Sequence, residues 1–93
     1  MTRTEILDRA KRIVVGDREQ DYGSPEDSFQ TCADLWEAYI SHCGCHPISA
    51  KDVAVMLALL KIARIAQGHA KEDNWVDLAG YAACGGEIES DNG

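Results

Sequence analysis

Residues 53–66 limit the fold of this chain more than any other segment, because they are apolar on almost every side of a helix. Only Lys61 and Arg64 interrupt them. A helix that is apolar all round needs neighbours on several faces, so we expect it at the centre of a domain. No segment alternates apolar and polar residues in the manner of a half-buried strand. The chain is therefore predicted to fold as an all-α domain around one buried helix.

Capping residues divide the rest of the chain into further helices. Three hydroxyl residues stand where helices should begin and two glycines where they should end: Thr2, Ser24 and Ser49, and Gly16 and Gly68. Glu5 and Asp52 follow two of these caps at the capping-box position. A fourth helix is expected from Asp73 towards the glycine pair near residue 85. Short connections favour antiparallel neighbours, so we predict a four-helix bundle.

The chain has 93 residues, which allows one domain with a modest core. We assign residues 1–86 to this domain and residues 87–93 to an acidic C-terminal tail. Large apolar residues on the second and third predicted helices exceed what four short helices can cover. They are Phe29, Trp36, Tyr39, Val55, Met56 and Leu59. We therefore expect homo-oligomerisation to complete the bundle.

The charge and the N-terminus exclude several classes of protein. The net charge is −7, from 16 acidic and 9 basic residues, which argues against a binder of bulk nucleic acid. A local phosphate site needs only a few cations and stays open. There is no apolar signal sequence, and no apolar run approaches the ~20 residues of a membrane span. We expect a cytoplasmic protein with no membrane partner, whose four cysteines are thiols.

Two charged pairs interrupt apolar helical sequence. Lys61 and Arg64 are three residues apart near the end of the third helix, and Asp73 and Asp77 are four apart at the start of the fourth. Each pair shares a helix face, and an antiparallel turn would bring the pairs together. One interpretation is a salt-bridge network that fixes the register of the helices. The other is a polar pocket, in which the cations bind phosphate and the carboxylates bind Mg²⁺, a base or a sugar.

The segment 17–23 is a dense polar loop ahead of a helix N-terminus. Helix N-termini suit anions. Arg18 is a candidate phosphate ligand, and Tyr22 is a candidate for stacking on a base. The alternative is a solvated turn in which Gly23 supplies an unusual backbone angle.

The segment 42–46 carries two cysteines and two histidines, namely His42, Cys43, Cys45 and His46. Structural zinc sites favour two cysteines separated by two to four residues, with a second, distant pair of ligands. Cys43 and Cys45 are separated by one residue, so we predict a polar turn between helices and no metal site.

Three segments together resemble a known group of proteins. They are Asp21-Tyr22-Gly23, Lys61-x-x-Arg64, and Glu72-Asp73-x-x-x-Asp77-Leu78-x-x-Tyr81-Ala82. Over residues 5–85 they resemble a family of small phage and prophage proteins. That family is similar to the MazG-like all-α nucleotide pyrophosphohydrolases and to a phage nucleotide-modification-associated domain.

This resemblance implies a MazG-like helical bundle and a nucleotide ligand. MazG-like enzymes hold Mg²⁺ with Glu-x-x-Glu on one helix and Glu-x-x-Asp on the next, and cut NTPs to NMP and pyrophosphate. Here the third helix carries Asp52 followed by apolar residues up to Lys61, and Asn74 stands three residues before Asp77. Mg²⁺ bridging phosphates needs several carboxylates, so the resemblance favours binding over hydrolysis.

The main hypothesis is a phage protein that sequesters a phosphorylated nucleotide or a nucleotide-derived signal, with an anti-defence role. The expected ligand-binding residues are Arg18, Tyr22, Lys61, Arg64, Asp73, Asp77 and Tyr81, and no catalytic residue is assigned. Arg18, Lys61 and Arg64 would contact phosphate, and Tyr22 or Tyr81 would stack on the base. One alternative is a Mg²⁺-dependent NTP pyrophosphohydrolase. The other is a helical adaptor with no small-molecule ligand.

Overall fold

The computed structural model describes residues 1–17, 25–44, 46–68 and 71–92. It contains four α-helices and one π-helical turn: α1 (Arg3–Arg12), η1 (Ile13–Asp17), α3 (Pro25–Cys43), α4 (Ala50–Ala66) and α5 (Glu72–Asn92). No strand occurs in these described residues. The all-α prediction is therefore confirmed.

The predicted helix caps form where the structure describes them. The Glu5 amide donates to the Thr2 hydroxyl at 3.2 Å at the start of α1. A complete capping box opens α4, because the Asp52 amide donates to the Ser49 hydroxyl and the Ser49 amide donates back to the Asp52 carboxylate. Gly68 follows α4 with a φ of 81°, as expected of a glycine stop. The predicted cap Ser24 lies outside the described residues.

Two predicted helix ends were wrong. The first helical segment does not stop at Gly16 but continues through it as η1, because Gly16 does not adopt the positive φ of a glycine stop. The last helix passes through the glycine pair to Asn92, so residues 87–92 are helical. Gly85 is buried, and a Cβ built on it would lie 3.1 Å from the Cβ of Ala54. This glycine allows α4 and α5 to approach closely instead of ending a helix.

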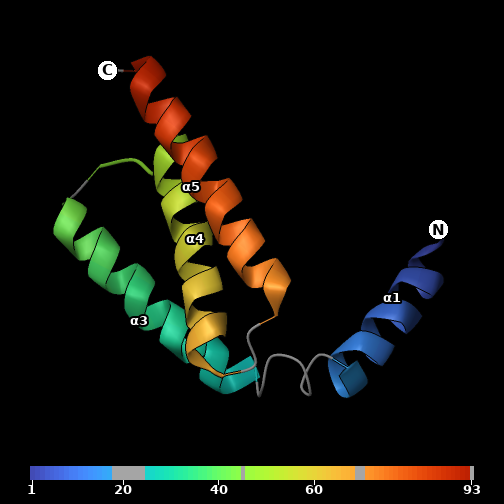
Figure 1. Ribbon diagram of the computed structural model, residues 1–93. Coiled ribbons are helices and arrows are strands. Elements are labelled where there is room, and N and C mark those ends of the chain that lie inside the picture. Colours follow the sequence, from blue (N-terminus) through green and yellow to red (C-terminus); the bar gives the residue numbers. More distant parts are fainter. Residues whose placement is uncertain (18–24, 45, 69–70, 93) are drawn as a thin grey trace.

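Helix α4 lies between α3 and α5, as expected for the most apolar segment (Figure 1). Its most extensive packing is against α5, which runs antiparallel to it. The Trp36 indole N–H of α3 donates to the Met56 carbonyl of α4 at 2.7 Å, which fixes α3 on the opposite side. The buried apolar residues of the described chain are few and small: Cys32, Ala54 and Ala63.

Helix α1 lies apart from the other three helices (Figure 1). It has no buried residue, and its apolar side chains face solvent together with those of η1. These exposed residues are Ile6, Leu7, Ile13, Val14 and Val15. Isolated helices of this length are marginal in water, so contacts with another surface would stabilise α1.

Candidate functional site

The α4–α5 interface brings together two of the charges that the sequence singled out. The Lys61 ammonium lies 2.9 Å from the Asp77 carboxylate. Lys61 is buried, whereas 46% of the Asp77 side chain is exposed. The antiparallel packing of α4 and α5 produces this contact, as predicted from the spacing of the charges. The pair opens to solvent on the carboxylate side.

Asn74 lies one turn before Asp77 on α5 and is completely buried. Neither atom of its side-chain amide has a hydrogen-bond partner in the described part of the structure. An unsatisfied buried amide costs about 1–3 kcal/mol, so such a group is rarely retained without a use. In the sequence, Asn74 stands out only as a departure from the MazG-like motif. Its polar side chain on the apolar face of α5 is the sequence signal that could have assigned Asn74 to the site.

The remaining predicted site residues do not all join this pair. Arg64 is half-buried and lies near Cys32 of α3. Burial raises the pKa of the Cys32 thiol, and the positive charge of Arg64 offsets part of this rise. Asp73 is exposed in the first turn of α5, where an acidic side chain interacts favourably with the helix dipole. Arg18 and Tyr22 lie outside the described residues.

Tyr81 lines a groove of about 500 Å³ along α4 and α5. The wall of this groove is mostly apolar, and Lys51 and Glu89 are the charged residues in it. Lys61, Arg64 and Asp77 do not contribute to it. Tyr81 therefore lines a different surface from Lys61 and Arg64, the two predicted phosphate ligands that the structure describes.

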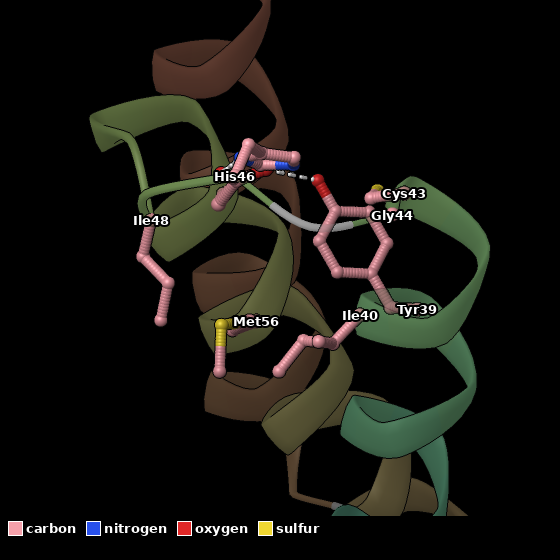
Figure 2. Close-up of a pocket in the computed structure, with 8 residues that line it drawn as sticks. Tyr39, Ile40, Cys43, Gly44, His46, Ile48 and Met56 are labelled. Carbon is pink, nitrogen blue, oxygen red and sulfur yellow. Dashed lines mark hydrogen bonds and ion pairs between the residues drawn. The ribbon is translucent and has the colours of Figure 1, made fainter.

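A second polar cluster lies where α3 turns into α4, around the buried carboxylate of Asp52. Figure 2 shows three of its members, Tyr39, Cys43 and His46. The Tyr39 hydroxyl donates to one Asp52 oxygen at 2.6 Å, and the Ser49 amide and hydroxyl both donate to the other at 2.9 Å. These bonds, that of Tyr39 foremost, lower the pKa of Asp52 to about 2. The same contact raises the pKa of Tyr39, so the phenol stays protonated.

Cys43 and His46 complete this cluster. The His46 Nδ1 atom lies 3.7 Å from an Asp52 carboxylate oxygen and 2.7 Å from the Pro47 carbonyl. Ligand atoms of Cys43, His46 and Asp52 all lie within 4.8 Å of one another. Asp52, which the sequence predicts as part of a helix cap, thus also lies beside a cysteine and a histidine. Cys45 lies outside the described residues.

Comparison with known proteins identifies the family of the chain. A family model described as "Domain of unknown function (DUF6378)" matches residues 5–89. The chain belongs to this family. The "Gene 55 protein" of Mycobacterium phage L5 is 44% identical over 77 residues, which cover 83% of this chain and 47% of that protein. The "Gene 55 protein" of Mycobacterium phage D29 is 38% identical over 79 residues, which cover 85% of this chain and 50% of that protein.

Both relatives come from phages, which confirms the predicted resemblance to a family of small phage proteins. The chain spans about half the length of these two relatives. No solved structure matches the chain. None of the described helices is long and apolar enough to cross a membrane.

Proposed function

We propose that this protein binds a phosphorylated nucleotide or nucleotide-derived signal at the α4–α5 interface and sequesters it without cutting it. One observation carries the proposal: a buried lysine, Lys61, lies on the same interface as Asn74, a buried amide without a partner among the described residues. A purely structural interface gains more from apolar side chains of the same volume than from such groups. Polar groups retained at this cost suit a polar ligand.

The ligand class follows from the donors that the interface offers. The ammonium of Lys61 suits phosphate. Arg64 follows Lys61 by three residues on α4 and lies near Cys32 of α3, and we propose that its guanidinium reaches the same phosphate with two parallel N–H donors. Asp77 orients Lys61 through their contact at 2.9 Å. The amide of Asn74 suits a base edge or a ribose hydroxyl, because it both donates and accepts.

The MazG-like part of the hypothesis supports a nucleotide but does not support hydrolysis. Asn74 stands where a MazG-like enzyme would carry a glutamate, and Asp73 is exposed at the start of α5. Asp77 is committed to Lys61. A Mg²⁺ ion that bridges phosphates needs several carboxylates on one site, and these residues offer at most two. For a phage protein, a cyclic-nucleotide or ADP-ribose-type defence signal is one candidate ligand.

Thermal unfolding against a panel of nucleotides, with Mg²⁺ and with a chelator, separates this proposal from both alternatives. A specific ligand raises the melting temperature by mass action, and we expect a rise that persists in the chelator and is not accompanied by release of pyrophosphate. Steady Mg²⁺-dependent release of pyrophosphate would instead establish the pyrophosphohydrolase. Absence of any shift across the panel would favour the helical adaptor.

We also propose that a second copy of the chain completes the bundle by placing its α1 on the α3–α4 surface of the first. An apolar groove of about 300 Å³ lies there, lined by Phe29, Cys32, Ala33, Trp36 and Leu60. The charges are complementary. Helix α1 has an excess of basic residues, Arg3, Arg9, Lys11 and Arg12, over the acidic Glu5 and Asp8. Helix α3 carries Glu26, Asp27, Asp34 and Glu37 and no lysine or arginine.

Light scattering at micromolar concentration tests this assembly. We expect a dimer or larger oligomer that dissociates when charge is introduced on the apolar side of α1. A monomeric wild-type protein would refute it, and would indicate that α1 folds back onto its own chain or stays uncovered.

A further inference from the structure

The turn between α3 and α4 gathers three side chains with different donor atoms, and the local sequence explains why. Cys43 is the last residue of α3, and Gly44 reverses the chain with a φ of 85°. Asp52 is drawn to the same place because it closes the capping box of α4. His46 belongs to the same turn, and its Nδ1 atom lies 3.7 Å from an Asp52 carboxylate oxygen. The positions of Cys43 and Asp52 are thus fixed by a helix end and a helix cap.

The hydrogen bonds of this cluster leave atoms that suit a cation. Asp52 is a carboxylate, held by hydrogen bonds from Tyr39 and Ser49. The Pro47 carbonyl can only accept, so the His46 Nδ1 atom that lies 2.7 Å from it carries the proton. Nε2 is then the ring nitrogen that can bind an ion. A histidine that donates one ring N–H to a carbonyl while its other nitrogen binds the ion is the usual arrangement of metal ligands.

The space beside these groups matches a single ion. A small cavity of about 20 Å³ is bounded by the three side chains and by Tyr39, and Ile40, Ile48 and Met56 form its apolar wall (Figure 2). A cavity of this size holds about one water molecule or ion. An apolar wall excludes competing water and strengthens the interaction between a cation and a carboxylate.

We propose that Cys43, His46 and Asp52 form a zinc-binding site. Thiolate, imidazole and carboxylate together are the donors that zinc accepts, whereas Mg²⁺ and Ca²⁺ bind oxygen ligands. Zinc bonds of about 2.0–2.3 Å at tetrahedral angles place the donors roughly 3.5 Å apart. One ligand atom from each of the three side chains, for His46 a ring nitrogen, lies within 4.8 Å of the others, so the donors would move closer together on binding. Cys43 and His46 are exposed and can move, while Asp52 is buried and fixed.

The site would have two consequences for the protein. The ion would join the end of α3 to the start of α4, and so stabilise the corner that positions the central helix. Three protein ligands also leave one coordination position for water or for an exogenous group. Tyr39 would act as a positioning residue, because its hydroxyl orients the Asp52 carboxylate.

Cobalt titration of the chelator-treated, reduced protein tests the site independently of any nucleotide. We expect one Co²⁺ per chain, with a thiolate-to-cobalt charge-transfer band and the visible bands of tetrahedral cobalt, and displacement of cobalt by zinc. Cys43→Ser should abolish the charge-transfer band. His46→Gln should weaken cobalt binding at least about tenfold.

Matched controls lie close by in the same chain. Cys84 is an exposed thiol on α5, and His42 is an exposed residue one position before Cys43 on α3. Cys84→Ser and His42→Gln should leave the cobalt spectrum unchanged. Asp52→Asn also removes a helix cap, so the decisive variant is His46→Gln, which alters an exposed side chain and leaves the helices intact by circular dichroism. A wild-type protein without the charge-transfer band, or a His46→Gln protein with wild-type affinity for cobalt, would overturn the proposal.

Discussion

Replacing Asp77 with alanine should destabilise the protein through the lysine that it leaves behind. Lys61 is 8% exposed, and its ammonium lies 2.9 Å from the Asp77 carboxylate. Breaking a fully buried pair costs about 3–5 kcal/mol, whereas surface pairs contribute about 0–1 kcal/mol. Because 46% of the Asp77 side chain is exposed, solvent screens part of the interaction. We therefore expect a loss of about 1–2 kcal/mol.

Urea unfolding followed by circular dichroism measures this loss, with Glu87→Ala as the control. Glu87 is an exposed acidic residue on the same helix, and its replacement should change the free energy of unfolding by less than about 0.5 kcal/mol. The double variant Asp77→Ala with Lys61→Met should recover most of the loss, because no buried charge remains. If Asp77→Ala and Glu87→Ala unfold at the same urea concentration, the ion pair does not stabilise the α4–α5 interface and the reasoning fails.

Three further predictions follow from other parts of the fold. Gly80→Ala should stabilise the protein by about 0.5–1 kcal/mol, because a Cβ there meets no atom within 4 Å. Gly85→Ala should lack this gain, because its Cβ would lie 3.1 Å from the Cβ of Ala54, and thermal unfolding of the two variants measures the difference. The low pKa of Asp52 contributes stability that is complete above about pH 4 and is lost as the pH falls towards 2. Tyr39→Phe removes the main cause of the low pKa, so acid unfolding monitored by circular dichroism should begin at a higher pH. Leu7→Glu, on the exposed apolar side of α1, should convert the oligomer to a monomer by light scattering without loss of helix content, and an unchanged mass would remove α1 from the interface.

The sequence predicted the starts of two helices correctly, because helix caps depend only on residues within one turn. The hydroxyl of Thr2 and the capping box of Ser49 and Asp52 act within one turn, so the sequence alone locates them. The contact between Lys61 and Asp77 also followed from spacing, because a short antiparallel connection leaves few registers for the two helices.

Features that depend on distant contacts could not be predicted in this way. Gly85 looked like a helix stop, and only the approach of Ala54 from α4 shows why glycine is needed inside a helix. Asp52 looked like a cap alone, and its second set of neighbours, Cys43 and His46, comes from the path of the turn. The exposure of α1 was unexpected, because its apolar spacing is the same as that of a packed helix.

Calorimetric titration of the wild type and of Arg64→Ala, with the nucleotide that gives the largest thermal shift and with a chelator present, tests the central claim most directly. Arg9→Ala, which removes an exposed arginine from α1, is the matched control. We predict that the wild type and Arg9→Ala bind the nucleotide with equal affinity, and that this binding weakens as the salt concentration rises. Arg64→Ala should bind at least about tenfold more weakly, because a charge-assisted hydrogen bond contributes about 1.5–3 kcal/mol. Equal affinities of the wild type and Arg64→Ala, or no heat of binding for either, would contradict a phosphate site between α4 and α5.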